Sequence, residues 1–443
     1  MKQILKAISK YALIYIIVII IFIIALVLSA LFPRDWIQPK TEESAFTLFN
    51  EGDRQYILDM TLDNYTEALM INTAYSMDPK HPFESVMLAR KNYLPEKEQV
   101  VHQDGNGELR SSIEGGFNII GELYRTVQKD INESYEYARY WHGYIVLLRP
   151  ALIFFNSNQI KMLMGVILAV SAFILLMELR KKVQAKFCYI ILLGLAFADF
   201  FLMGTTMQAV LTFVISMIAS IIISKRFNKI KNIGPYFMVI GMVTCFFDLL
   251  THPIITLGIP MIVYLLLKQE KEKITLKEAI KIIVLDSILW GIGYLLTNVT
   301  KWILVEVFYH RDLIHTALSQ FFYRSQADVN NVPRYLGLAV IQNFEHAGIR
   351  TSMYFGILLV YVVIYLIRNY KEIQFNGKEA IPYLIISFMP IAWYLLMNNH
   401  DMDHAYFTYR GLAVFYIGIG IFLLKLVNVK ETLKSSEKEK NEI

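Results

Sequence analysis

Ten apolar segments divide this chain of 443 residues, and they restrict its fold more than any other feature. They cover residues 11–32, 162–177, 187–202, 210–223, 236–250, 254–267, 282–296, 354–367, 383–396 and 412–426. Each has about 14–22 residues, and a membrane-spanning helix needs roughly 20, with tilt and flanking aromatic residues accommodating shorter ones. Hydrophobic residues make up 55% of the chain and charged residues 18%, which is too apolar for an ordinary soluble protein. The pattern predicts an all-α polytopic membrane protein with about ten transmembrane helices.

The first apolar segment follows a basic stretch, as the core of a signal peptide does. Its apolar core is too long for a signal peptide, however, and no convincing small-x-small cleavage site follows it. We therefore expect residues 1–32 to be a retained transmembrane helix. Cys188 and Cys245 both lie within apolar segments, which favours buried free thiols over a disulfide.

Lysine and arginine are concentrated in the loops on one side of the predicted membrane. About 24 of the 43 Lys and Arg residues lie in residues 1–10, 180–186, 225–231, 268–281, 368–378 and the tail from Lys425. Because cytoplasmic loops carry such an excess, we expect both termini in the cytoplasm and the protein in the plasma membrane. The net charge of +5 then reflects topology and contact with anionic lipid, not binding of nucleic acid.

This orientation leaves two long loops outside the cytoplasm. The chain then divides into six parts: an N-terminal helix (1–32), a first extracytoplasmic subdomain (33–156), a helical bundle (157–298), a second extracytoplasmic loop (299–352), C-terminal transmembrane helices (353–427) and a cytoplasmic tail (428–443). Both long loops contain amphipathic, aromatic stretches that favour helices lying in the membrane interface. The cytoplasmic loops have only about ten residues each, too few for a nucleotide-binding domain. Any chemistry is therefore expected at the extracytoplasmic face.

Two carboxylates stand near the start of the first extracytoplasmic subdomain. Asp35 comes directly after the first apolar segment, and Asp63 precedes the helical pattern NYTEALMINTAYS. A carboxylate at this level can act as a general base in a reaction at the lipid head groups. A solvated interfacial charge explains Asp35 equally well, and the N-cap of the following helix explains Asp63. The capping and catalytic roles are compatible.

The segment RYWHGY, residues 139–144, combines cations with aromatic rings. Arg139 and His142 suit an anionic phosphate, and Trp141 and Tyr144 suit stacking against the group attached to it. An interfacial aromatic belt with an extended arginine is the alternative explanation.

The segment HDMDHAYFTYR, residues 400–410, is the third candidate. His400 and His404 are four residues apart and would share one face of a helix. Such spacing can ligate a divalent metal ion, but no catalytic glutamate accompanies it on this short loop, so no metal cofactor is expected. Contact of His404 and Arg410 with a phosphate or a sugar is the favoured role, with ordinary loop polarity as the alternative.

Asp248 and His252 lie at the extracytoplasmic ends of apolar segments. Ionisable groups at this depth are costly and are therefore functional candidates, although helix-end residues reaching water explain them as well. We expect a single outward-facing cavity with a lateral opening to lipid. Its expected lining is Asp63, Arg139, His142, Asp248, His252, His404 and Arg410.

In the arrangement of these features the chain resembles the integral-membrane glycosyltransferases of the GT-C superfamily. The likeness covers most of the chain: one membrane helix, a large extracytoplasmic subdomain with an early aspartate, then many membrane helices with a second such loop late in the chain. It implies transfer of a sugar from a polyprenyl-phosphate carrier to an acceptor at the outer face. Asp35 or Asp63 would be the base, and the carrier phosphate would be held by Arg139, Arg350 or Arg410. The segments DNYTEALM and RYWHGY are also similar to those of an uncharacterised bacterial multi-pass family.

Three other classes of protein remain open. A lipid-linked polysaccharide polymerase or ligase shares the chemistry at the outer face, but its main catalytic loop is expected later in the chain. A transporter favours helices broken by Gly or Pro, with polar residues at the midplane, and midplane charges are nearly absent here. A non-enzymatic protein of envelope assembly would leave the extracytoplasmic Asp, Arg and His residues scattered. Whether these residues converge on one cavity is therefore the observation that separates the hypotheses.

Overall fold

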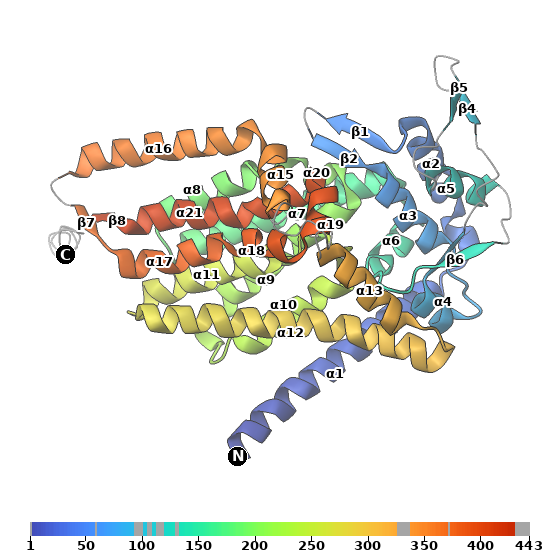
Figure 1. Cartoon of the computed structure of the whole chain (residues 1–443), viewed down its shortest axis with the longest axis horizontal. Coiled ribbons are helices and arrows are strands. Elements are labelled where there is room, and N and C mark those ends of the chain that lie inside the picture. The colour runs from blue at the N-terminus through green and yellow to red at the C-terminus, as the bar shows by residue number, and fades with distance from the viewer. Residues whose placement is uncertain are drawn as a thin grey trace, which may run out of the picture.

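The computed structural model describes residues 2–57, 60–92, 101–103, 109–111, 119–128, 133–325, 337–370 and 373–429. Long helices lie side by side in a bundle, and short helices and strands form a subdomain at one end of it (Figure 1). The last described residues lie at the opposite end of the bundle (Figure 1). Most of the predicted tail, from residue 430 onward, lies outside the described part of the chain.

Seven helices in the described chain are long and apolar enough to cross a membrane. They are α1 (Lys2–Ala30), α7 (Ser157–Arg180), α9 (Met207–Arg226) with η2 (Phe227–Lys229), α12 (Leu276–Tyr309), α16 (Ile349–Asn369), α17 (Gly377–Ser387) with α18 (Met389–Leu396), and α20 (Ala405–Thr408) with η3 (Tyr409–Leu412) and α21 (Ala413–Leu426). Three shorter helices complete the bundle: α8 (Ala185–Ala196), α10 (Gly234–Phe247) and α11 (Ile255–Lys271). The predicted all-α chain with several apolar helices of membrane length is confirmed, whereas the number ten and the orientation stay predictions.

α12 is much longer than the apolar segment that predicted it. It continues without a break to Tyr309, so the predicted boundary after residue 298 falls inside a helix. Lys301 lies just beyond the predicted boundary, in a stretch that we expected to form an interfacial helix. Its ammonium group is nevertheless buried and donates a hydrogen bond to the carbonyl of Val86 at 2.6 Å. The second loop then contains α13 (Leu313–Ser325) and α15 (Leu338–Ala347).

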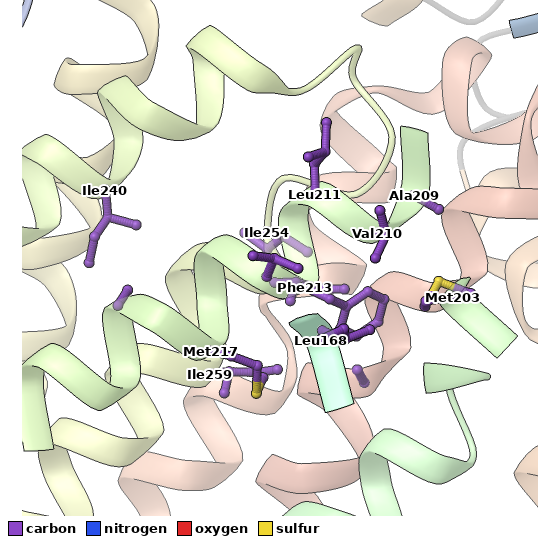
Figure 2. Packing of buried hydrophobic residues seen from close by; sticks show 14 of the residues in the cluster. Leu168, Met203, Ala209, Val210, Leu211, Phe213, Met217, Ile240, Ile254 and Ile259 are labelled. Carbon is purple, nitrogen blue, oxygen red and sulfur yellow. The ribbon is translucent and has the colours of Figure 1, made fainter. Parts of the chain in front are cut away.

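The bundle has a buried centre and an exposed periphery. In Figure 2, Phe213 and Met217 of α9 pack with Leu168 of α7 and Ile259 of α11. Within the apolar stretch of each helix, the buried share is 78% in α9 and 83% in the helix from Ala405 to Leu426, but only 11% in α16. The large side chains on α16 therefore face outward, as expected for a helix in contact with lipid.

Glycines allow α10 and α12 to approach closely. A Cβ atom at Gly241 would collide with the carbonyl of Trp290, and one at Gly293 would collide with the carbonyl of Met238. Small residues permit such backbone contact between membrane helices, where dispersion rather than water exclusion drives association.

The subdomain is built from short elements. They are α2 (Arg34–Glu51), β1 (Arg54–Ile57), β2 (Met60–Asp63), α3 (Asn64–Tyr75), α4 (Pro82–Leu88), β3 (Arg90–Asn92), β4 (Val101–Gln103), β5 (Leu109–Ser111), α5 (Ile119–Gln128), β6 (Ser134–Glu136) and α6 (Ile145–Ala151). The antiparallel pairs are β1–β2, β3–β6 and β4–β5, and β7 (Ile373–Phe375) pairs with β8 (Val427–Val429) at the far end of the bundle. Gly52 at the end of SAFTLFNEG predicts the end of a helix, and α2 does end there. α3 begins after Asp63, also as predicted.

Buried charged side chains join this subdomain to the bundle. The Arg149 guanidinium on α6 donates to the carbonyls of Ala74 and Phe32. Glu67 on α3 accepts a hydrogen bond from the amide of Met207 at 3.0 Å and pairs with Lys161 at 3.2 Å. These contacts fix α3 against the first residues of α9, where the two parts of the chain enclose a cavity.

Candidate functional site

A cavity of about 370 Å³ lies where the subdomain meets the end of the bundle. Its walls come from four regions: the β2–α3 junction, the β3–β6 pair with the segment after it, the start of α9 with the α10–α11 loop, and α13 together with α19 (Asn398–Asp403) and α20. Its ionisable lining residues are Asp63, Lys91, Arg139, Arg324, His400 and His404. Four of the residues predicted from the sequence, Asp63, Arg139, His400 and His404, therefore share one cavity.

Asp63 is placed by secondary structure. It is the last residue of β2 and the N-cap of α3, where its Oδ1 accepts the amide hydrogen of Thr66 at 3.0 Å and its Oδ2 accepts the Thr66 hydroxyl at 2.5 Å. The Tyr406 hydroxyl also interacts with this carboxylate. The capping role is thus present, and the same side chain lines the cavity. Asp35 is exposed in the first turn of α2 and does not line the cavity.

Two guanidinium groups supply positive charge. Arg324 donates to the Tyr140 hydroxyl at 2.5 Å, and Arg139 lies over the Tyr137 ring at 5.9 Å. Neither guanidinium forms an ion pair with a carboxylate in the described part of the chain.

The other charges of the cavity nearly cancel. Lys91 is neutralised by Glu122, whose carboxylate lies 2.6 Å from its ammonium group. Asp63 is then the carboxylate that faces Arg139 and Arg324, so the cavity has a net positive charge. Such a site favours an anionic group, and two guanidinium forks suit a phosphate.

His400 and His404 stack with their ring centres 4.5 Å apart. The His400 Nε2 donates to the carbonyl of Leu250 at 2.7 Å, and the His404 Nδ1 donates to the carbonyl of His400 at 3.0 Å. Burial lowers the pKa of both imidazoles, so both are neutral at neutral pH. The His404 Nε2 is then a hydrogen-bond acceptor on a residue that lines the cavity.

Within the described residues, no group of three or more His, Cys, Asp or Glu side chains is arranged to hold a metal ion. Each of the paired histidines uses one ring nitrogen on a backbone carbonyl.

The segment 139–144 builds the wall of the cavity but supplies only part of its surface. Trp141 is fully buried and donates to the carbonyl of Thr297 at 2.7 Å, and Tyr144 is buried as well. The structure places neither ring on the cavity, in contrast to the sequence-based expectation that they stack on a ligand. Tyr135, Tyr137 and Tyr140 line it instead.

His142 lies behind these tyrosines. Its Nε2 donates to the carbonyl of Tyr137 at 2.7 Å, and its Nδ1 accepts from the Tyr144 hydroxyl at 3.0 Å. Its backbone has a φ of 57°, in the left-handed region, and the next residue, Gly143, lies close against Phe246. Burial lowers the pKa of His142 to about 3. The side chain is therefore a neutral structural group and not a cation.

Asp248 and His252 are buried and do not line the cavity. Asp248 accepts hydrogen bonds from the amide of Thr251 at 3.0 Å and from its hydroxyl at 2.5 Å, and His252 donates to the carbonyl of Ala209 at 3.1 Å. Burial raises the pKa of Asp248 to about 6 and lowers that of His252 to about 3. Thr251, between them in sequence, is the residue that reaches the cavity.

The two remaining arginine candidates are held in the bundle. Arg350 pairs with Asp199 at 2.9 Å, and the same carboxylate accepts the Tyr409 hydroxyl. Arg410 is buried, lies 4.9 Å from the Tyr409 ring centre and donates to the carbonyl of Phe407 at 3.3 Å. Neither lines the cavity. Arg324 lines the cavity in their place. In the sequence it could have been recognised as the basic residue near the end of the amphipathic stretch LIHTALSQFFYRS.

The arrangement defines a class of protein: an α-helical chain with membrane-length helices and a basic, tyrosine-lined cavity at one end of the bundle. Comparison with protein families finds no match for this chain, and neither do comparisons with curated proteins and with solved structures. The functional argument therefore depends on the chemistry of the cavity.

Proposed function

We propose that this protein is a GT-C-like glycosyltransferase of the plasma membrane, which moves a sugar from a polyprenyl-phosphate carrier to an acceptor at the outer face. The observation that supports the proposal is the convergence on one cavity of a carboxylate, a neutral histidine and two guanidinium groups that form no ion pair with a described carboxylate. The cavity lies at the end of a bundle of apolar helices, where a lipid-borne phosphate would be presented. No nucleic acid and no metal take part in this proposal.

In the proposed reaction, the acceptor hydroxyl attacks the anomeric carbon of the sugar as the bond from that carbon to the phosphate oxygen breaks. Arg139 and Arg324 stabilise the negative charge that develops on the departing polyprenyl phosphate. Asp63 accepts the proton of the acceptor hydroxyl, and the His404 Nε2 is a second acceptor within the same cavity. Tyr137 and Tyr140 offer aromatic faces to the sugar.

The test compares the two aspartates that the sequence left as alternatives. Asn is as good an N-cap as Asp, so Asp63→Asn keeps the start of α3 while removing the base. In purified protein reconstituted with lipid-linked sugar donors, Asp63→Asn is expected to slow transfer by about 10²–10⁴-fold. Asp35→Asn is the matched control, because Asp35 is exposed on α2 and outside the cavity, and it should leave the rate unchanged.

Full transfer activity in Asp63→Asn would remove Asp63 as the base. The alternative is a non-enzymatic or transport-type protein of envelope assembly. It would gain support if the wild-type protein bound polyprenyl phosphate but transferred no sugar from any lipid-linked donor.

A further inference from the structure

The hairpin of β1 and β2 brings an arginine close to the proposed base. Arg54, the first residue of β1, lies directly opposite Asp63, the last residue of β2, in the antiparallel register. Side chains at directly opposite positions share one face of a hairpin, with Cβ atoms about 5 Å apart. Opposite charges at such positions attract each other, so the hairpin by itself favours an ion pair between the Arg54 guanidinium and the Asp63 carboxylate.

Tyr406 separates these two charges. The hairpin lies beside α20, which carries Tyr406 (Figure 1). The guanidinium carbon of Arg54 lies 5.0 Å from the centre of the Tyr406 ring, within the range of a cation–π interaction. The Tyr406 hydroxyl donates a hydrogen bond to the Asp63 carboxylate. In the part of the chain that the structure describes, Arg54 and Asp63 form no ion pair with each other.

An ion pair with Arg54 would weaken Asp63 as a base. A guanidinium fork occupies carboxylate lone pairs and favours the charged form, so a paired carboxylate accepts a proton less readily. In the structure, neutral donors hold Asp63 instead: the amide and the hydroxyl of Thr66 and the hydroxyl of Tyr406. They fix the carboxylate at the cavity without adding a full positive charge to it.

Tyr406 also contacts the second proton acceptor of the cavity. Its ring centre lies 6.2 Å from that of His404, with 27° between the two ring planes. His404 stacks in turn on His400, whose Nε2 is anchored on the carbonyl of Leu250. Tyr406 is not one of the residues that line the cavity, so any effect that it has on a reaction there passes through Asp63 and His404.

We infer that Tyr406 is a positioning residue for the proposed reaction, on which this inference rests. Its ring holds Arg54 away from Asp63, and its hydroxyl keeps the unpaired carboxylate at the cavity. The β1–β2 hairpin and α20 are far apart in the sequence, so the base becomes available only when the subdomain is seated on the bundle.

The test is a double-mutant cycle on the full-length protein in phospholipid nanodiscs, with transfer from a polyprenyl-phosphate sugar as the readout. Tyr406→Ala should lower kcat by about ten- to a hundredfold, the combined value of an ion pair with an exposed arginine and a hydrogen bond to a carboxylate. KM for the donor should stay the same, because Arg139 and Arg324 are unchanged. Tyr406→Phe keeps the ring and loses only the hydroxyl, so its kcat should fall less.

Removal of Arg54 distinguishes this role from a structural one. In Tyr406→Ala/Arg54→Gln no guanidinium is left to pair with Asp63, so kcat should return to the value of Tyr406→Phe. Tyr56→Ala is the matched control, because it removes an exposed ring from the same strand, and it should leave kcat unchanged. Wild-type kcat in Tyr406→Ala would overturn the inference. So would a kcat that stays equally low after Arg54 is removed, because Tyr406 would then be a packing residue.

Modification by a hydrophobic carbodiimide provides a measurement that does not depend on sugar transfer. The reagent attacks the protonated carboxyl group, so an ion pair with a guanidinium protects a carboxylate from it. Mass spectrometry should find modified Asp63 in the wild type and in Tyr406→Ala/Arg54→Gln, and several-fold less in Tyr406→Ala. Asp63→Asn identifies the modified position. Equal or greater modification in Tyr406→Ala would contradict the inference.

The two measurements separate this inference from the proposed function. The expected pattern of carbodiimide modification, with no transfer from any polyprenyl-phosphate sugar, would retain the separation of Arg54 from Asp63 and reject the glycosyltransferase. Transfer that is lost in Asp63→Asn but is indifferent to the Tyr406 variants would retain the enzyme and reject the positioning role.

Discussion

Two segments of this protein place histidines among aromatic rings beside the same cavity, yet they use them differently. In the segment 139–144, both ring nitrogens of His142 are occupied by partners from that segment and from Tyr137. In the segment 398–410, the His404 Nδ1 is anchored on a backbone carbonyl, and its Nε2 remains an acceptor. A histidine whose two nitrogens are both satisfied stabilises the fold, whereas one with a single anchored nitrogen is held in position with a free atom for a ligand.

The largest expected difference between His404 and His142 is in the rate of sugar transfer. His404→Ala is expected to reduce kcat by about 10²-fold, the lower range for loss of an acid–base group, because Asp63 remains. The thermal midpoint should fall modestly, since one hydrogen bond at 3.0 Å and the stacking on His400 are lost. Steady-state kinetics with a lipid-linked donor provide the measurement.

The pH profile distinguishes a proton acceptor from a merely structural histidine at this position. Burial lowers the pKa of His404, so the required neutral form is lost only on acidification below the ordinary pKa of about 6.5. An acid limb of kcat below that pH in the wild type should disappear or shift in His404→Ala. If the rate falls only in proportion to the loss of folded protein, His404 has a structural role, as His142 does.

A smaller effect is expected for the phosphate contact. Arg324→Ala should raise KM for the donor by about ten- to a hundredfold, the value of one or two hydrogen bonds to a charged group, and should also lower kcat, because the guanidinium stabilises the departing phosphate. Arg324→Lys should recover part of this loss, because it keeps the charge without the fork. The matched control is Arg311→Ala in the same region, where the guanidinium is half exposed and pairs with Glu136 outside the cavity. Equal KM values for both alanine variants would remove Arg324 from the site.

The smallest expected effect on activity, and the clearest on stability, is at His142. His142→Ala removes the hydrogen bonds to the Tyr137 carbonyl and from the Tyr144 hydroxyl in the interior, which should lower the free energy of unfolding by about 2 kcal/mol. KM for the donor should not change in the folded fraction. Denaturation followed by circular dichroism measures the difference, with His315→Ala on the exposed face of α13 as control.

The sign of the pH dependence follows from the low pKa of about 3 at His142. Below pH 6.5 the unfolded chain binds a proton that the folded chain does not, so stability falls as pH falls, by about 1.4 kcal/mol per pH unit. The slope should be shallower in His142→Ala between pH 6.5 and pH 5. An unchanged slope would show that His142 is not kept neutral by burial.

Local features of the fold could be predicted because they depend on neighbouring residues. The apolar segments became helices, Gly52 ended α2, and Asp63 capped α3. The boundary after residue 298 could not be located, because the burial of Lys301 depends on the carbonyl of Val86, which is far from it in the sequence.

The site could be predicted only in part. Asp63, Arg139 and His404 were expected in a common cavity and are found there, whereas Asp248, His252 and Arg410 are directed into the interior by their hydrogen bonds. Sequence spacing does not show which of two adjacent side chains, such as His252 or Thr251, faces an open space. Arg324 was missed because the residue that identifies its role, Tyr140, is far from it in the sequence.

The sequence by itself determined the helices of this protein, the residues that begin and end several of them, and the supply of ionisable groups near their ends. Those properties arise from hydrophobic periodicity, run length and capping, which operate over a few residues. Only the tertiary structure decided which ionisable groups line the cavity and which form hydrogen bonds in the interior. Asp63 and His404 are hundreds of residues apart, and they share a cavity because Glu67, Arg149 and Lys301 hold the subdomain against the bundle.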